Sequence, residues 1–346
     1  MQYWQIASGS FGRDYTEDFL KFGMAFVGGE DQRRMMKEVQ CGDRVILKKG
    51  KYVMAVGVVE ARDGKCQGDK GDGEKQWLSE EFDGWDLSAY CFIAWREIKP
   101  RYHAPELTIA TIQRVRQPHL IEWAKGCLAS LPVRERADEP PQPDQVDDDD
   151  ILKHLIKQGL RVGAAEELTI AFKRIRLLAQ YYYDKGDEWV DVREHETRTF
   201  LIIPLLLALG WAEQQIKIEL PVSKKRRVDI ACFRAGPFTK KREDVVMLIE
   251  TKGFSQGLDD AVKQAKLYAK HFRNCQLMVA TNGYCYKTFE RDTKGDYSRP
   301  SAYLNLLHPR NQYTRDPEVG GCLKALELLL PSSRMQNGRR QAPAQQ

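Results

Sequence analysis

Two short apolar runs, VDIACF (residues 228–233) and VVMLIETK (residues 245–252), decide the fold of the second half of the chain. Each has the length and the β-branched content of a buried strand. Each also carries charge that a buried strand normally excludes, namely Asp229 in the first run and Glu250 and Lys252 in the second. Residues two apart on a strand project from the same face, so Glu250 and Lys252 are expected to point the same way. Buried charges destabilise a fold unless they are paired or functional, which makes these three candidate site residues.

The segments around these runs predict a mixed sheet flanked by helices. EHETRTFLIIPLLLALGW (194–211) has the apolar periodicity of a helix, and a strand, IKIELPV (216–222), follows it. After the second run come a helical stretch, LDDAVKQAKLYAKHF (258–272), and two strands, QLMVATNG (276–283) and YCYKTFERD (284–292). The order of helix, three strands, helix and two strands predicts an α/β (α+β) domain.

Two carboxylates and a lysine that converge at a strand end suit phosphodiester hydrolysis. If the strand of Asp229 lies beside that of Glu250, the two carboxylates can share a hard divalent cation, Mg²⁺ or Mn²⁺. Such a cation stabilises charge on a phosphodiester and lowers the pKa of a bound water. An acid-x-lysine triplet alone is a weak signal, because exposed triplets of this kind are common. The acid on the preceding strand is what favours a catalytic site here.

The pattern D-x20-E-x-K formed by Asp229, Glu250 and Lys252 resembles that of the PD-(D/E)XK, or restriction-endonuclease-like, nucleases, with valine in place of the proline of the family name. The segment ETRTFLIIPLLLALGW (196–211) is similar to the leading helix of the nuclease domain at the N terminus of type I restriction-enzyme R proteins. The resemblance implies a metal-dependent nuclease in which Asp229, Glu250 and Glu196 hold the metal.

Two further motifs extend the resemblance. Gln264-x-x-x-Tyr268 follows the E-x-K strand, and its spacing places both side chains on one helical face. It is similar to the QxxxY branch of these nucleases, in which such residues line the active site and orient the lysine and the nucleic-acid backbone. TNG at 281–283 matches the motif that closes the next strand, although Asn-Gly is also a common hairpin turn. The R proteins continue into helicase-like motors, whereas this sequence contains no Walker motif and predicts no ATP-driven motor.

A break in composition divides the chain. RERADEPPQPDQVDDDD (134–150) holds three prolines, many acids and almost no apolar residues, which is typical of a solvated linker. Its last aspartates are expected to place negative charge at the N terminus of a helix starting at Ile151. The predicted organisation is a first domain over 1–130, a linker over 131–150, a helical connector over 151–190, a nuclease domain over 191–310, and a C-terminal helix with a disordered tail over 311–346.

The first domain consists of short apolar runs separated by glycine-containing turns, which predicts a small β-barrel. The runs are YWQIA (3–7), GMAFVGG (23–29), GDRVILKKG (42–50), KYVMAVGVVEA (51–61) and AYCFIAWREI (89–98). They resemble the strands of PUA-like barrels, and of the EVE domain in particular. That resemblance implies nucleic-acid binding in which a flipped, modified base enters an aromatic pocket. Trp4 and Trp85 are the preferred aromatic pair, with core packing as the alternative, and Ser8 is a candidate partner for a base edge.

The whole chain has the composition of an ordinary globular protein: 346 residues, 42% hydrophobic and 30% charged, with a net charge of +5. The longest apolar run, 200–209, is about half of the ~20 residues that a membrane-spanning helix needs. The first residues lack a signal-peptide pattern. We therefore expect a cytoplasmic protein whose eight scattered cysteines are reduced.

A basic run, formed by Lys224, Lys225, Arg226 and Arg227, precedes the Asp229 strand and could neutralise phosphates or be a solvated turn. A domain that binds modified bases before the linker and a nuclease domain after it together predict a Mg²⁺-dependent DNA endonuclease of the modification-dependent restriction or anti-phage type. Cutting both strands favours a homodimer. The alternatives are a non-catalytic nucleic-acid-binding protein with a nuclease-like fold, and an RNA-directed or exonucleolytic nuclease.

Overall fold

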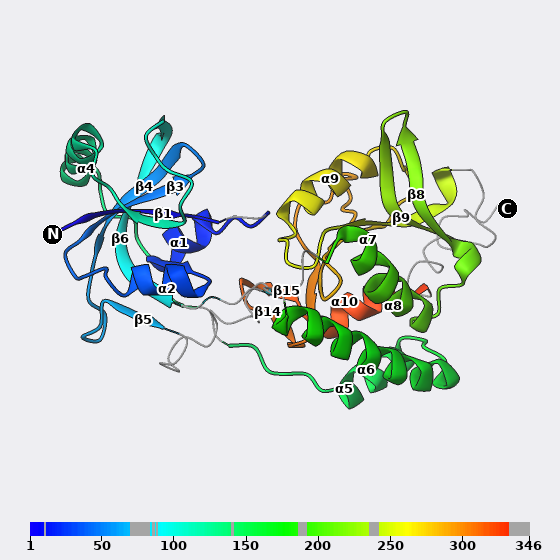
Figure 1. Ribbon diagram of the computed structural model, residues 1–346. Helices are drawn as coiled ribbons and strands as arrows, with labels where there is room; N and C mark the ends of the chain where they lie inside the picture. Colours follow the sequence, from blue (N-terminus) through cyan, green and yellow to red (C-terminus); the bar gives the residue numbers. More distant parts are fainter. Residues whose placement is uncertain are drawn as a thin grey trace. The chain divides into compact units, whose positions relative to one another are not determined.

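The computed structural model describes residues 1–9, 12–69, 84, 87, 89–139, 142–185, 192–234 and 242–331. The chain divides into an N-terminal unit, Met1–Gln142, and a C-terminal unit, Pro143–Gln346, each with its own sheet (Figure 1). Within the described ranges, no helix combines the length and the apolar content that crossing a bilayer requires.

The N-terminal unit is built on one seven-stranded sheet with the order β2-β6-β4-β3-β1-β7, in which β5 pairs with β6. The first residues of β6 pair with β2 and β5, and its later residues pair with β4, so this 15-residue strand continues from one part of the sheet into the other. The strands are β1 (Tyr3–Ala7), β2 (Met24–Val27), β3 (Arg44–Lys49), β4 (Tyr52–Val59), β5 (Gln67–Asp69), β6 (Ala89–His103) and β7 (Ile112–Arg114). The helices are α1 (Thr16–Phe22), α2 (Glu30–Met36) and α4 (Pro118–Ser130).

The closed barrel predicted for this unit is present only as a half-barrel. β2 and β7 end the sheet on opposite sides, and no described strand joins them. One face packs a largely aromatic core that includes Trp4, Phe19 and Trp95. The other face packs against α4 through Leu120 and Ala124. Both faces of the sheet are therefore covered without closure of the barrel.

The expectation that every cysteine is reduced is wrong for one pair. Cys41 and Cys66 form a disulfide with their Cα atoms 5.5 Å apart. Next to Cys66, Gln67 is the first residue of β5, and its side-chain amide donates to the carbonyls of Lys37 (3.0 Å) and Val39 (2.9 Å). These bonds hold β5 against the segment that leads to Cys41. The other six cysteines are free.

The C-terminal unit holds the predicted mixed sheet, here of eight strands in the order β14-β15-β13-β12-β11-β10-β9-β8. β10 and β11 are parallel and are connected through α9, whereas β9 is antiparallel to both of its neighbours, β8 and β10. The strands are β8 (Ile216–Ser223), β9 (Arg226–Phe233), β10 (Val245–Thr251), β11 (Leu277–Thr281), β12 (Cys285–Glu290), β13 (Ala302–Asn305), β14 (Gln312–Tyr313) and β15 (Asp316–Gly320). The sheet thus extends past residue 310, the predicted end of the nuclease domain, to β14 and β15.

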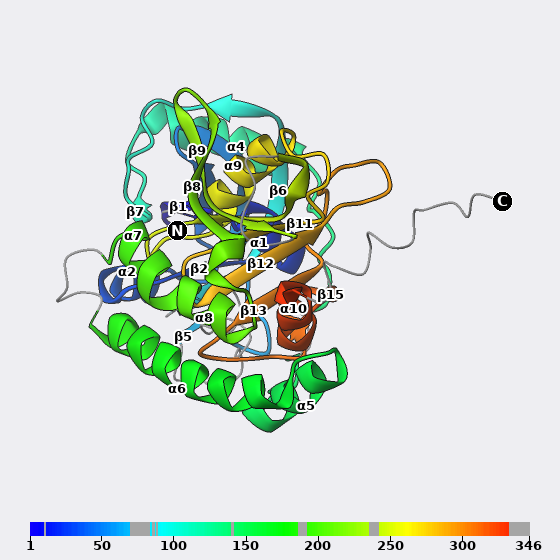
Figure 2. The ribbon, with the colours of Figure 1, turned by 90° about the vertical axis from the view of Figure 1, so that its right-hand side faces the viewer.

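Helices cover both faces of this sheet. α9 (Asp259–Ala269) lies on one face, where Ala265 and Tyr268 join a cluster with Leu248 of β10 and Met278 of β11. The opposite face packs against α6 (Val162–Asp184), α8 (Ile203–Ala208), α10 (Cys322–Leu329) and, through them, α5 (Asp148–Lys157) (Figure 2). α5 begins three residues earlier than predicted, because Asp147 caps it by accepting from the backbone N–H of Asp150 at 2.7 Å.

The leading helix predicted over 194–211 is three consecutive helical segments. α7 (Glu194–Thr197) runs into a π-helical turn, η3 (Arg198–Ile202), and then into α8. Pro204 lies in the first turn of α8 and lacks the N–H that a regular α-helix would use there. π-helical turns inside α-helices often mark functional sites. Here the turn begins at Arg198, which contacts the acids described below.

Candidate active site

The register of the sheet places Asp229 beside Glu250. β9 and β10 are antiparallel with Ile230 opposite Ile249, so the next pair along the ladder is Asp229 with Glu250. Directly opposed residues on neighbouring strands project from the same face. The two acids that the sequence singled out therefore lie side by side near the end of both strands.

Asp229 is fixed by donors from two elements. Its Oδ2 accepts from the backbone N–H of Thr251 (2.7 Å) and from the hydroxyl of the same residue (3.0 Å). Its Oδ1 lies 3.5 Å from Nη1 of Arg198, and Nη2 of Arg198 lies 3.3 Å from Glu219. The carboxylate is thereby oriented by the neighbouring strand and by the π-helical turn.

Glu250 is buried without hydrogen-bond partners. Its side chain is fully shielded from solvent, and neither carboxylate oxygen accepts or donates a hydrogen bond. Burial, and next the negative charge of Asp229, raise the pKa of Glu250 to about 9. An unpartnered buried carboxyl is costly, and a cation between the two acids would supply the missing partner.

Lys252 is held at the end of β10 by a chain of hydrogen bonds. Its Nζ donates to the carbonyl of Thr251 (2.9 Å) and to Oε1 of Gln264 (3.2 Å). Nε2 of Gln264 donates in turn to the hydroxyl of Tyr268 at 3.1 Å. Of the i,i+4 pair on α9, Gln264 thus contacts the lysine directly, and Tyr268 is linked to it through Gln264. Gln264 fixes the ammonium and Tyr268 fixes Gln264.

The helix acid next to this lysine is Glu194, not the predicted Glu196. Oε2 of Glu194 lies 3.7 Å from Nζ of Lys252. Burial, and next the charge of Asp229, raise the pKa of Glu194. Glu196 is exposed, and its Oε2 accepts from the backbone N–H of Arg193 at 2.7 Å, which closes a capping box at the start of α7. The capping role turns Glu196 away from Lys252.

The TNG turn connects the elements that carry these residues. The side-chain amide of Asn282 donates to the carbonyls of Phe254 (3.1 Å) and Gln256 (3.0 Å), and the backbone N–H of Lys252 donates to the carbonyl of Thr281 (2.9 Å). Gly283 has a φ of +96°, and a Cβ there would come within 2.6 Å of Thr197 and Leu201. The turn therefore holds the loop after β10 and also lets the leading helix approach closely. This positioning role was not predicted.

Among the described residues, no group of three His, Cys, Asp or Glu side chains converges closely enough to hold a metal ion. The acids available are the neighbouring pair Asp229 and Glu250, with Glu194 beside the lysine. A Mg²⁺ ion keeps several waters and is commonly bound by only one or two carboxylates. The pair is thus compatible with an ion that keeps several of its waters. It is not compatible with an ion whose ligands all come from the protein.

Comparison with protein families gives one match. Residues 193–302 match the family model of the type I restriction enzyme R protein N terminus. This segment runs from the start of the leading helix to β13, so it contains Asp229, Glu250, Lys252 and the QxxxY pair. The match supports a restriction-enzyme-like nuclease domain within the C-terminal unit. It covers roughly a third of the chain and leaves the N-terminal unit unassigned.

Two solved structures resemble parts of the chain. One is a fragment assigned as an HsdR subunit of a type I restriction enzyme from Vibrio vulnificus, with 18% identity over 31% of this chain and 22% of that chain, at a TM-score of 0.25. The other is a protein from Agrobacterium tumefaciens, with 15% identity over 42% of this chain and 100% of that chain, at a TM-score of 0.24. Both TM-scores are too low to establish a shared fold. No curated protein matches the chain.

The basic run at 224–227 forms the exposed turn of the β8–β9 hairpin. Lys224 and Lys225 are the turn residues, and Arg226 and Arg227 begin β9 three and two residues before Asp229. Arg227 lies 3.7 Å from Glu219. The turn is accessible to a polyanion, and it is part of the same hairpin that carries Asp229.

The predicted base pocket of the N-terminal unit does not form around Trp4. Its side chain is fully buried, and its indole N–H donates to Oδ2 of Asp43 at 2.9 Å. Ser8 is also buried, and its Oγ accepts from the hydroxyl of Thr16 at 2.8 Å. Trp85, the other member of the predicted pair, lies outside the described residues. In this conformation neither Trp4 nor Ser8 is exposed to a ligand.

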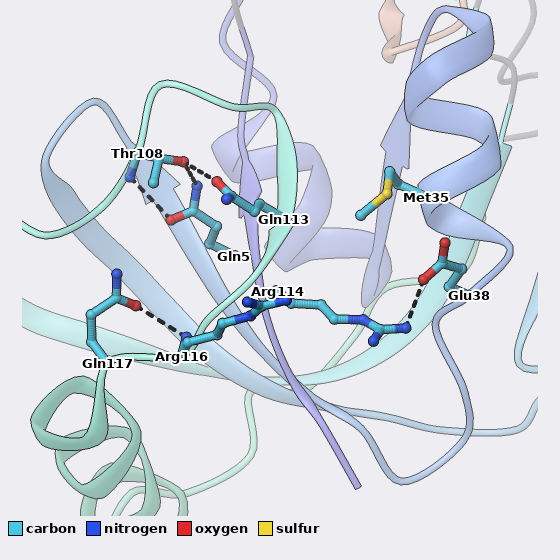
Figure 3. A pocket seen from close by; sticks show the side chains of 8 residues that line it. All are labelled: Gln5, Met35, Glu38, Thr108, Gln113, Arg114, Arg116 and Gln117. Carbon is cyan, nitrogen blue, oxygen red and sulfur yellow. Dashed lines mark hydrogen bonds and ion pairs between the residues drawn. The ribbon is translucent and has the colours of Figure 1, made fainter.

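A polar pocket of about 470 Å³ lies beside β1 and β7 instead (Figure 3). Thr108 bonds there to two glutamines, since its backbone N–H donates to Gln5 (3.2 Å) and its hydroxyl donates to Gln113 (2.6 Å). Arg114 crosses the pocket to Glu38, where the two groups lie 2.6 Å apart, as Figure 3 shows. The lining residues come from three separate segments, around residue 5, at 35–38 and at 108–117, so no single local motif indicated this pocket.

Proposed function

We propose that the C-terminal unit is a divalent-cation-dependent DNA endonuclease and that the N-terminal unit selects its target, in modification-dependent restriction or anti-phage defence. The observation that carries the proposal is the adjacency of Asp229 and Glu250, with an ammonium group fixed beside them by Gln264. The match of 193–302 to the R-protein N terminus supports the same chemistry.

The residues present fit a hard cation. Asp229 and Glu250 would hold Mg²⁺ or Mn²⁺, because Glu250 is a buried carboxyl with no partner and a pKa of about 9 in the absence of a cation. When bound, the ion would stabilise charge on the phosphate and lower the pKa of a water. Because a ligand carboxyl must be deprotonated, binding of the ion would displace the proton of Glu250.

The protein groups divide the remaining work. Lys252 places a positive charge where negative charge develops on the phosphate and orients the attacking water. Gln264 and Tyr268 fix that ammonium, and Oε2 of Glu194 lies 3.7 Å from it. The exposed basic turn at 224–227 would neutralise phosphates of the DNA backbone, which positions the duplex without specifying its sequence.

The proposed target is DNA with modified bases. Support for a separate reader is the division of the chain into two compact units and the presence of a polar pocket in the first of them. Cleavage of both strands requires two active sites, which we assign to two copies of the chain.

Exchanging the two helix acids separately distinguishes their roles. We expect Glu194→Gln to lower the single-turnover cleavage rate by at least about tenfold, because a charge next to Lys252 is lost, as for other residues that orient an active site. Glu196→Gln is the matched control, since glutamine also completes a capping box. It should cleave at close to the parental rate. Equal loss of rate in both variants would contradict the assignment of Glu194.

Separating the units tests the division of labour. Residues 1–142 should bind duplexes with a preference for modified bases and should not cleave them. Residues 143–346 should cleave with little preference, and their affinity should fall steeply as salt rises, because phosphate contacts release counterions. Affinities for matched duplexes, modified and unmodified, at two salt concentrations provide the measurement. If residues 143–346 alone reproduce the full preference, the reader assignment is wrong.

A further inference from the structure

An apolar stripe runs along the outer side of α6. Val162, Ile170 and Leu177 expose 71%, 69% and 73% of their surface, and Tyr181 exposes 45%. The residues that α6 turns toward its own core are Ala165, Leu168, Phe172, Ile175 and Ala179. Residues seven or eight apart fall on the same side of a helix, so these side chains share a second apolar side, away from the core. α6 lies on the outside of the C-terminal unit (Figure 2).

Four exposed charged residues flank the centre of the stripe. Glu166 and Glu167 precede Ile170 by about one turn, and Lys173 and Arg174 follow it by the same distance. Within the part of the chain that the structure describes, none of the four side chains forms an ion pair or a hydrogen bond. The acids and bases of one helix are about 10 Å apart along its axis, too far to pair with one another.

We propose that α6 binds α6 of a second copy of this chain in an antiparallel pair, with the two-fold axis at Ile170. The axis brings each acidic side chain next to a base of the other copy. Glu166 faces Lys173 of the partner subunit, and Glu167 faces Arg174 of the partner subunit. At about 100° per residue, Glu166 and Lys173 lie on one flank of the stripe and Glu167 and Arg174 on the other, so both pairs form together.

The same two-fold axis also makes the two helix surfaces complementary in shape. It places Leu177 of the partner subunit over Gly163, beside Val162. A Cβ at Gly163 would meet no atom within 4 Å, so the surface there is open to an incoming side chain. A parallel pair would instead set the acids of one copy against the acids of the other, and like charges at such spacing repel. Charge and shape therefore favour the antiparallel arrangement.

The test uses the full chain and does not depend on cleavage, so its failure and that of the nuclease proposal are distinguishable. Sedimentation velocity at protein concentrations from about 1 to about 200 µM should show a reversible dimer. Reversible association is expected because a single helix pair buries a small area compared with stable protein interfaces. Ile170→Asp should weaken dimerisation at least about tenfold by burying a charge at the axis. Ile156→Asp makes the same change at an exposed position on α5, off the stripe, and should leave the dimer unchanged.

Charge reversal tests the pairing itself. The variant with Glu166→Lys and Glu167→Lys and the variant with Lys173→Glu and Arg174→Glu should each dimerise at least about tenfold more weakly than the parent. An equimolar mixture of the two should recover the dimer, because every contact is again between opposite charges. A parent that stays monomeric throughout, as it would if the stripe packed against its own N-terminal unit, overturns the proposal. A dimer that is insensitive to the reversals overturns it as well.

Discussion

Lys252→Ala is expected to lower the single-turnover cleavage rate by about 10²- to 10³-fold, since a preorganised donor at a developing oxyanion contributes this much. Lys252 is 15% exposed, bonds to Gln264 and lies 3.7 Å from Glu194, so its ammonium is fixed rather than mobile. Its removal leaves the metal-binding acids in place. Metal binding and folding should therefore be nearly unchanged, as judged by calorimetric titration with Mn²⁺ and by thermal unfolding.

A matched control is available on α9. Lys263→Ala makes the same change at a side chain that is 72% exposed and pairs with Asp260. This variant should cleave at the parental rate. If Lys252→Ala cleaves as fast as the Lys263→Ala control, the assignment of the active site is wrong.

The second large effect is expected from Glu250→Gln, which should abolish metal binding and cleavage yet stabilise the metal-free protein. The pKa of Glu250 is raised from 4.5 to about 9 in the folded protein. Above pH 4.5 the unfolded chain releases a proton that the folded chain retains, so folding stability falls as pH rises until about 9. Glutamine carries no such proton, and its amide can donate to Asp229.

The measurement is thermal unfolding in EDTA between pH 5 and pH 9. We expect Glu250→Gln to be more stable by about 1–3 kcal/mol at pH 8, which is a rise in Tm of several degrees for a unit of this size. The advantage should shrink toward pH 5 and should vanish when Mg²⁺ is added to the parent. Glu213→Gln, at an exposed position, serves as the control. A metal-free Glu250→Gln protein that is less stable than the parent at pH 8 would contradict the account of this carboxyl.

The centre of the site follows from local rules. Strand alternation places Glu250 and Lys252 on one face, and antiparallel pairing of consecutive strands brings Asp229 beside Glu250. The helical spacing of four does the same for Gln264 and Tyr268. Each of these relations spans at most one turn or one strand pairing. This is why the sequence alone predicts them.

The helix acid could not be chosen in this way. Glu194 and Glu196 both lie in a four-residue helix, and the choice between them depends on where that helix begins. Its capping box starts at Arg193, which is not one of the usual N-cap residues, so the sequence does not indicate where α7 begins. The π-helical turn that follows shifts the phase of the later residues as well. Only the folded arrangement separates the acid that caps from the acid that meets Lys252.

The N-terminal unit shows the same limit over longer distances. Alternation indicates that Tyr3 and Trp4 point to opposite faces, but not that Trp4 enters the core and meets Asp43. Closure of the barrel would need β2 and β7 to pair across most of the unit, and short runs of sequence carry no signal for that pairing. The disulfide between Cys41 and Cys66 likewise depends on a contact between distant segments.

The most direct test of the central claim is single-turnover incubation of the full chain with supercoiled plasmid. Plasmids with and without modified cytosines, and RNA in parallel, are each incubated with Mg²⁺, with Mn²⁺ or with EDTA, using the parent and Lys252→Ala. The account predicts that the parent cleaves modified plasmid in Mg²⁺, and that neither the EDTA reaction nor the variant gives product. Cleavage that persists in EDTA or in Lys252→Ala, or the absence of any DNA cleavage in Mg²⁺ and Mn²⁺, would contradict it.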